Sequence, residues 1–261
     1  MDRLLQPGSL EKNDVYIPRT IQDAIEICKR MGQKFLWVDS LCIIQDEGDP
    51  DKAANIARMG RIYGEAVFTI VAGDAKTADS GMMGITKDRL VSDQLIDKVP
   101  GGIQLFLPIG MQQDFHHWKS RAWTFQEKML SIRMLLIASG YAVWRCRGGI
   151  WREDVNALDG NIKSAPFPWS HVKSIPESED SVRKSGLRIL EKDESVRLFR
   201  SPAFCQYVKL VEGLSSRQIE EPWRILDAFE GVLRVLESPE ILTSTFRYGL
   251  PTRFIDTSLL W

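Results

Sequence analysis

The sequence predicts an α/β domain in which helices flank a parallel sheet, followed by a helical part. Helical and strand-like apolar patterns alternate over residues 20–72, an order that favours parallel strands joined by right-handed crossovers. A small, polar stretch over residues 73–84 follows the last of these runs, and sites in open α/β sheets collect at this strand end. We assign residues 1–150 to this domain, residues 151–200 to a linker with a charged helical segment, and residues 201–261 to a helical extension.

The first predicted elements are a helix and a strand. Thr20 can cap the helix, with Asp23 three residues later as a weaker form of the capping-box acid. Gly32 follows the last apolar residue at helical spacing and ends the helix. The apolar run Phe35-Leu36-Trp37-Val38 then predicts a buried parallel strand that ends at Asp39.

Turn residues and apolar spacing predict the remaining elements. Asp49-Pro50 begins a helix, and Ser120 can cap a short one that runs through Met129. Ser139-Gly140 suits the turn of a hairpin. Residues 156–186 are rich in Pro, Ser and charge and form the best linker candidate. Further strands are expected over residues 67–72, 103–107, 134–138 and 141–146, and further helices over residues 183–200, from Ser201-Pro202 and from Pro222.

The composition excludes several classes of partner. The 34 basic and 35 acidic residues give a net charge of −1, so the chain has no general attraction to nucleic acid or anionic membrane. No apolar run approaches the roughly 18 residues of a membrane span. Asp2 and Arg3 follow Met1 without an apolar h-region after them, so we expect no signal peptide. Four widely spaced cysteines suit a reducing compartment. We therefore expect a cytoplasmic protein with neither nucleic-acid nor membrane partners.

Generic catalytic and metal-binding signatures are missing from the sequence. It holds no nucleophile elbow, Walker loop or Rossmann glycine fingerprint. His116-His117 lacks neighbouring ligands and is typical of a surface or packing pair, and Cys42 in an apolar run is typical of a buried, inert thiol. We predict neither a metal site nor a bound cofactor. Asp39 is either a ligand-facing acid at the sheet edge or a carboxylate that caps backbone N–H groups.

A second candidate cluster is formed by Arg121, Trp123, Gln126 and Glu127. On a helix Trp123 and Glu127 are four residues apart, so an aromatic face and an acid share one side. Such a side could bind a flat cationic ring and stabilise developing positive charge. The alternative is a Trp123 buried in the core with Glu127 paired to a basic neighbour, and the residues alone leave both open.

The longest motifs resemble the fungal heterokaryon incompatibility (HET) domain. FLWVDSLCIIQDEGDPDKAANIARMGRIYGEAVFTIVAGDAKTADSGMMG is similar to the centre of that domain, and TIQDAIEICKRMG to its lead helix. SRAWTFQEKMLSIRML resembles its Trp-x-x-Gln-Glu block followed by Leu-Ser-x-Arg. YAVWRC, Trp151-Arg152-Glu153, LDAFEG and YGLPTRFIDTSLLW extend the resemblance over nearly the whole chain. It implies a role in nonself recognition, where fusion of unlike partners triggers cell death.

The family also resembles Toll/interleukin-1 receptor (TIR) domains in its order of elements. The resemblance implies a TIR-like or flavodoxin-like sheet with Asp39 after its second strand. Residues 1–19 depart from the family, because they lack the Ser-Tyr-x-Trp-Gly strand that usually precedes the lead helix. We therefore expect this first strand to be missing. Some TIR domains cleave NAD, and Glu127 falls near the glutamate that contacts the nicotinamide ribose in those enzymes.

Two functional hypotheses follow. In the first, the domain causes cell death through self-association or protein partners, without chemistry of its own. In the second, it is a TIR-like NAD glycohydrolase with NAD as substrate. Glu127 would then be catalytic, and the residues tentatively assigned to substrate binding are Asp39, Arg121, Trp123 and Gln126. A DNA-binding regulator fits poorly, because the sequence shows no recognition-helix signature.

The tryptophans are unusually frequent. Eight are present, and an idle tryptophan is unfavourable because its N–H needs a partner. Five of them fall within the blocks that resemble the HET pattern: Trp37, Trp123, Trp144, Trp151 and Trp261. The resemblance does not account for Trp118, Trp169 and Trp223.

Overall fold

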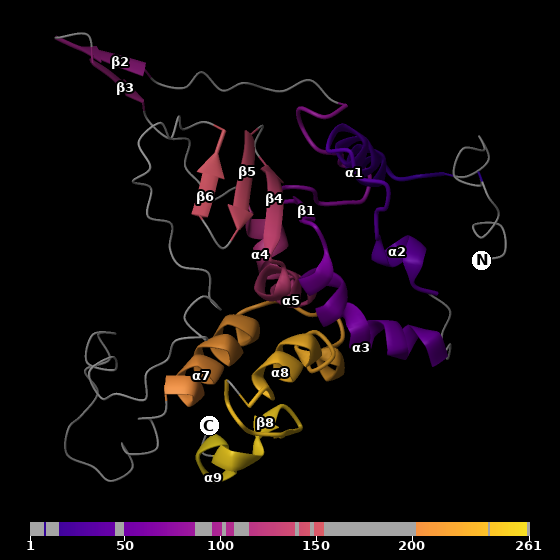
Figure 1. The fold of residues 1–261 in the computed structure, drawn as a ribbon, viewed down its shortest axis with the longest axis vertical. Helices are drawn as coiled ribbons and strands as arrows, with labels where there is room; N and C mark the ends of the chain where they lie inside the picture. The colour runs from indigo at the N-terminus through magenta and orange to yellow at the C-terminus, as the bar shows by residue number, and fades with distance from the viewer. Residues whose placement is uncertain are drawn as a thin grey trace. The chain divides into compact units, whose positions relative to one another are not determined.

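The computed structural model has a mixed α/β fold that divides into two compact units (Figure 1). Unit 1 comprises Met1–Arg58, Ala66–Trp118 and Ile132–Ser164, and unit 2 comprises Met59–Glu65, Lys119–Ser131 and Ala165–Trp261. The expected linker over 156–186 and charged helix over 183–200 lie outside the residues that the structure describes. The described residues are 8, 16–44, 50–86, 96–100, 103–106, 115–138, 141–146, 149–153, 202–239 and 241–259.

Unit 1 contains a four-stranded sheet in the order β1-β4-β5-β6 (Figure 1). Its strands are β1 (Thr69–Ala72), β4 (Arg133–Ala138), β5 (Tyr141–Cys146) and β6 (Gly149–Arg152). β1 pairs with β4 in parallel, while β4–β5 and β5–β6 are antiparallel. The predicted strands over 67–72, 134–138 and 141–146 are confirmed. The prediction of a parallel sheet is right for one pair only, because hairpin-length connections force β4, β5 and β6 to alternate in direction.

The central strand β4 is covered on both faces. Met134, Leu136 and Ala138 pack with Phe115 and Trp118 in one cluster of buried residues. The intervening Leu135 and Ile137 belong to a second cluster, which includes Ile27 of α1 (Arg19–Arg30). This alternation is the period-two pattern of a strand with two buried faces. The unexplained Trp118 is thus a core residue, 8% exposed.

The helix α1 begins and ends close to the predicted residues, but its N-terminus is not capped as expected. Its N-cap is Pro18, which makes no side-chain cap, while Gly32 (φ 66°) ends the helix. Thr20 and Asp23 instead bind the loop that follows β1. The Thr20 hydroxyl accepts a hydrogen bond from the Gly81 N–H at 3.1 Å, and the buried Asp23 carboxylate accepts one from the Met82 N–H at 2.6 Å.

The predicted strand over residues 35–38 is wrong. These residues are irregular, Phe35 is 91% exposed, and the chain then enters α2 (Asp39–Cys42). A four-residue apolar run cannot by itself distinguish a strand from a connection. Asp39 consequently lies in the first turn of a helix and not at the end of a strand. Cys42 is exposed, which also corrects the expectation of a buried thiol.

Two further features of the first half of the chain agree with the sequence. The helix α3 (Pro50–Glu65) begins at Pro50, as expected for a proline in the first helical position. The strand expected over 103–107 is β3 (Ile103–Phe106). It pairs antiparallel with β2 (Ile96–Val99), which the sequence analysis missed.

Unit 2 is built on three helices around one apolar core. They are α5 (Trp123–Leu130), α7 (Pro202–Ser215) and α8 (Glu230–Leu236). The core joins Phe125 of α5 to Phe204 and Tyr207 of α7 and to Phe229 and Val232 around the start of α8. The rings of Phe125 and Phe229 lie 6.0 Å apart, at an angle of 52°, a tilted geometry that aromatic pairs prefer.

Some boundaries in unit 2 differ from prediction. Ser120 is the last residue of α4 (His116–Ser120) and does not cap α5, whose N-cap is Ala122. Helix α7 begins at Pro202, as expected. Pro222 opens only a short 3₁₀ turn, η4 (Pro222–Arg224). The chain ends in a small hairpin and two short helices: β7 (Phe246–Arg247), β8 (Leu250–Pro251), η5 (Thr252–Phe254) and α9 (Ile255–Ser258).

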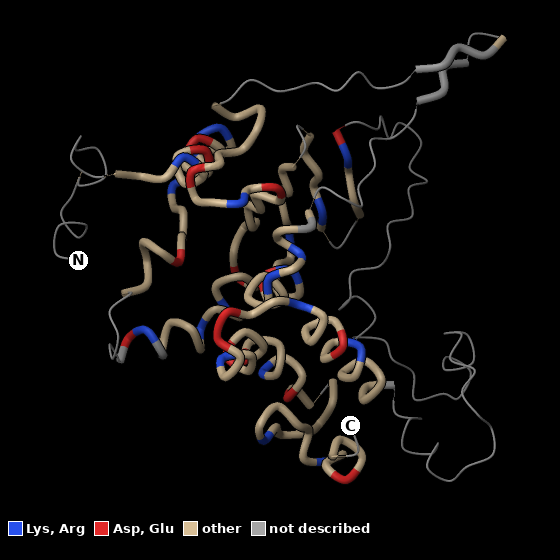
Figure 2. Tube along the Cα trace, turned by 180° about the vertical axis from the view of Figure 1, so that it is seen from behind, with Lys and Arg blue, Asp and Glu red and all other residues tan. Residues whose placement is uncertain are grey.

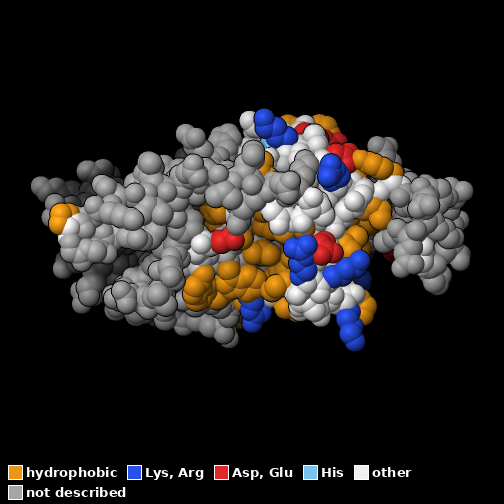
Figure 3. Space-filling model, turned by 90° about the horizontal axis from the view of Figure 1, so that it is seen from above, with side chains coloured by type: hydrophobic (Ala, Val, Ile, Leu, Met, Phe, Trp, Pro, Cys, Tyr) orange, Lys and Arg blue, Asp and Glu red, His pale blue; other side chains and the backbone are white. Residues whose placement is uncertain are grey.

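The described surface carries both signs of charge. Lys and Arg alternate with Asp and Glu along the trace, in keeping with the net charge of −1 (Figure 2). In the space-filling view, apolar side chains reach the surface among charged ones (Figure 3). Among the described helices, none has the length and apolar character that a membrane crossing requires.

Candidate functional site

The candidate cluster of Arg121, Trp123, Gln126 and Glu127 lies in unit 2, on α5 and the residue two positions before it. Backbone hydrogen bonds attach this segment to the chain just after α7. The Ala122 N–H donates to the Gln218 carbonyl at 2.8 Å, and the Gln218 N–H donates to the Ser120 carbonyl at 2.6 Å. The start of α5 is therefore held by a residue that lies nearly a hundred positions away in sequence.

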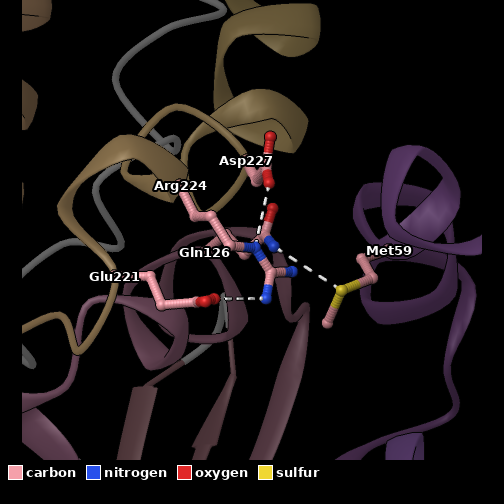
Figure 4. Close-up of polar contacts among 5 residues, drawn as sticks. All are labelled: Met59, Gln126, Glu221, Arg224 and Asp227. Carbon is pink, nitrogen blue, oxygen red and sulfur yellow. Dashed lines mark hydrogen bonds and ion pairs between the residues drawn. The ribbon is translucent and has the colours of Figure 1, made fainter. Parts of the chain in front are cut away.

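The ring of Trp123 makes a cation–π contact with an arginine of the same chain. The guanidinium carbon of Arg224 lies 5.0 Å from the centre of the Trp123 ring, within cation–π range. Arg224 is itself fixed between Glu221, at 3.0 Å, and Asp227, at 3.3 Å (Figure 4). The hydrogen bond to Glu221 raises the pKa of Arg224. One of the two alternatives for Trp123 was a face that binds a flat cationic ring, and in the structure the guanidinium of Arg224 lies over this ring.

Gln126 is enclosed by protein. It is 0% exposed, and its Nε2 points to Met59 Sδ at 3.8 Å (Figure 4). Its Oε1 has no hydrogen-bond partner within the described part of the chain. A Cβ at Gly231 would lie 2.8 Å from this Oε1 and 3.0 Å from Gly60 Cα. Gln126 thus lies where α5 meets Met59 of α3 and Gly231 of α8, although a buried acceptor without a partner is unfavourable by about 1–3 kcal/mol.

Glu127 lies close enough to Arg217 to act on its charge. Burial lowers the pKa of Arg217, and the negative charge of Glu127 opposes that effect. Arg217 Nη1 donates to the Arg121 carbonyl and to Thr124 Oγ1, each at 3.0 Å. Its guanidinium carbon lies 4.9 Å from the centre of the Phe125 ring. Arg217 therefore joins the first turns of α5 to the end of α7, and the partly buried Glu127 stabilises it in its charged form.

The remaining candidates are distributed over both units. Arg121 is exposed, and its backbone carbonyl accepts hydrogen bonds from the Thr124 hydroxyl and from Arg217 Nη1. Asp39 belongs to unit 1, where it is exposed and its Oδ1 accepts a hydrogen bond from the Ser40 N–H at 2.7 Å. This contact is a hydrogen bond from the backbone of the next residue, and it leaves both alternatives for Asp39 open. Within the described ranges, no three His, Cys, Asp or Glu side chains are grouped so that they could hold a metal ion.

The comparison with protein families identifies the part of the chain that contains this block. Residues 5–127 match the family described as heterokaryon incompatibility protein (HET). These residues are a HET domain. Neither a curated protein nor a solved structure matches the chain.

The HET match ends at Glu127, the last residue of the Trp-x-x-Gln-Glu block. It includes the lead helix and both candidate regions, around Asp39 and around Trp123. The HET-like motifs proposed further along the chain, YAVWRC and YGLPTRFIDTSLLW, lie beyond the matched residues and stay a prediction.

The sequence analysis missed the two arginines that contact the block. Arg217 and Arg224 both follow α7, far from α5 in sequence, and neither lies in a motif. The alternative of a basic partner for Glu127 named no residue; in the structure the charge of Glu127 acts on Arg217. Only the packing of α7 and α8 against α5 brings these cations to Trp123 and Glu127.

Proposed function

We propose that this protein is a fungal nonself-recognition effector whose HET domain triggers programmed cell death through self-association in the cytoplasm. The HET domain implies a function related to heterokaryon incompatibility. The observation that supports self-association over catalysis is the engagement of the Trp-x-x-Gln-Glu block within its own unit. Trp123 contacts Arg224, Gln126 contacts Met59, and Glu127 acts on Arg217.

The alternative is a TIR-like NAD glycohydrolase. Water would add to the ribose carbon, the bond to nicotinamide would break, and the products would be nicotinamide, ADP-ribose and a proton. A carboxylate can stabilise the oxocarbenium-like transition state of such a reaction. The partial exposure of Glu127 favours this alternative, because a ligand could reach it. Arg224 would have to leave the Trp123 face before nicotinamide could stack there.

The Glu127→Gln variant distinguishes self-association from NAD cleavage as the cause of cell death. It keeps the shape of the side chain and removes its charge, and Arg217 keeps its hydrogen bonds to Arg121 and Thr124. We expect the full chain with Glu127→Gln to kill fungal cells as fast as the unchanged chain, with no loss of cellular NAD before death. Glu237→Gln, an exposed acid beyond α8, is the matched control.

The opposite result would support the enzyme. If Glu127→Gln abolished both killing and NAD loss while Glu237→Gln did not, self-association without chemistry would be wrong. Conversely, the glycohydrolase would be excluded by a purified full chain that cleaves no NAD under conditions where it oligomerises.

A further inference from the structure

Unit 2 exposes an apolar surface around the turn of its C-terminal hairpin. Its members are Trp223, 76% exposed, Leu226, 37% exposed, and Tyr248, 91% exposed. Leu226 lies over Gly249, where a Cβ would come within 2.7 Å of Leu226 Cδ2. Trp223 lies three residues before Leu226 in a stretch that starts as a 3₁₀ turn, a spacing at which side chains tend to share one side. We call this set the Trp223–Tyr248 surface.

Tyr248 is held there in an unfavourable backbone conformation. Arg247 pairs with Leu250, so Tyr248 and Gly249 form the two-residue turn between β7 and β8. Both have positive φ, 52° for Tyr248 and 79° for Gly249. A turn of this type strongly favours Asn or Asp before the glycine, and a bulky aromatic residue is an outlier. The ring at 91% exposure gains little packing in return, and strained residues of this kind cluster at functional sites.

Exposed charges of opposite sign flank the members of this surface in the sequence. Glu220 is exposed and lies three residues before Trp223, while Arg247 is exposed and directly precedes Tyr248. In a two-fold pair, residue i of one copy meets residue j of the other and the reverse. Two copies could therefore place Glu220 of one against Arg247 of the other. The net charge of −1 leaves little repulsion between copies.

We infer that the Trp223–Tyr248 surface binds a second copy of this chain, with Glu220 facing Arg247 of the other copy. This inference rests on the proposed self-association and assigns its surface. Tyr, Trp and Arg are the residues most enriched among those that dominate binding at interfaces. The two exposed rings would contribute about 300 Å² per copy, more than a third of the roughly 800 Å² that each partner buries in a standard interface.

The first test uses Tyr248→Asn in the purified full chain, with sedimentation equilibrium to measure the Kd of self-association. Asn suits the positive φ better than Tyr, so the variant removes the ring while the turn is kept. Each substitution occurs twice in a two-fold pair, and we expect the Kd to rise by about a hundredfold. We expect Trp223→Ala to raise the Kd by a similar factor. Phe35→Ala, which removes an equally exposed ring from unit 1, should leave the Kd unchanged.

The second test identifies the partner as a second copy. Glu220→Arg and Arg247→Glu should each raise the Kd by about tenfold or more, because each places like charges opposite each other. An equimolar mixture of the two variants restores opposite charges at both contacts of a mixed pair. The mixture should therefore associate nearly as tightly as the unchanged chain. A mixture that associates no better than either variant alone would overturn the two-fold arrangement.

The outcomes also separate this inference from the proposed function. If the unchanged chain associates and Tyr248→Asn and Trp223→Ala leave its Kd unchanged, the surface is wrong and self-association stands. If the unchanged chain remains monomeric at about 100 μM, far above the concentrations at which specific complexes form, both the surface and the proposed self-association are wrong.

Discussion

The buried carboxylate of Asp23 should be decisive for the stability of unit 1. It lies at 0% exposure in α1 and accepts hydrogen bonds from the Met82 N–H, at 2.6 Å, and from the Thr86 hydroxyl. Both donors belong to the loop after β1, about sixty residues further along the chain. Asp23→Ala removes the acceptor and leaves the Met82 N–H buried, because Met82 is 1% exposed.

The magnitude follows from the two bonds. Hydrogen bonds to a charged group are worth about 1.5–3 kcal/mol each, so Asp23→Ala should lower the free energy of unfolding by roughly 3–5 kcal/mol. Asp23→Asn should lower it by only about 1 kcal/mol. The amide oxygen can accept from Met82, and the amide NH₂ can donate to the Thr86 hydroxyl, which serves as donor or acceptor.

Urea denaturation of the full chain measures the change, and hydrogen exchange over residues 81–86 locates it. Exchange at the Met82 amide should become fast in Asp23→Ala and stay slow in Asp23→Asn. Asp79→Ala is the control, because Asp79 binds Tyr16 and the Arg19 N–H at an exposed position and should contribute under about 1 kcal/mol. If Asp23→Ala unfolds within about 0.5 kcal/mol of the unchanged chain, the reasoning is refuted.

Three further predictions concern unit 2. Gly231→Ala would place a Cβ 2.8 Å from Gln126 Oε1 and 3.0 Å from Gly60 Cα, and calorimetry should show destabilisation of about 1–3 kcal/mol. Burial raises the pKa of Tyr207 from 10.0 to about 12. The contribution of protonated Tyr207 to the free energy of unfolding is therefore fully present below pH 10 and is lost as the pH rises through about 12. In Tyr207→Phe, the free energy of unfolding measured in urea should fall less over this pH range. Tyr248→Asn places a residue that tolerates positive φ at this turn, so it should increase the free energy of unfolding by about 1 kcal/mol and raise the melting temperature. A lower melting temperature would contradict the strain at this turn.

Residues close together in sequence were sufficient to predict the elements whose signals favour a single structure. Gly32 ends α1 and Pro50 begins α3, because each residue favours that position in any helix. The hairpin of β4 and β5 follows from two apolar runs separated by a two-residue turn. These features depend on neighbours in sequence, so the chain around them does not alter the outcome.

Features that depend on tertiary partners could not be predicted in this way. Phe35-Leu36-Trp37-Val38 reads as a strand, but a strand needs hydrogen-bonding neighbours, which the run cannot specify. Asp23 reads as a capping acid, and its true partners lie in the loop after β1. The same holds for the site: Trp123 and Glu127 could be picked out, while Arg224 and Arg217 had no sequence signal.

The tryptophans illustrate the same division. Trp118 is a core residue of unit 1, Trp169 lies outside the described residues, and Trp223 is 76% exposed. The count in the sequence could not distinguish these environments. The exposed Trp223 belongs to the surface that we propose binds a second copy of the chain.

The central claim is that the protein kills by self-association through unit 2 and not by chemistry at Glu127. The most direct measurement is the rate of cell death in a fungal host that expresses the full chain at matched levels. We predict that Tyr248→Asn abolishes killing and that Glu127→Gln leaves it unchanged. Killing that survives Tyr248→Asn and is lost with Glu127→Gln would contradict it.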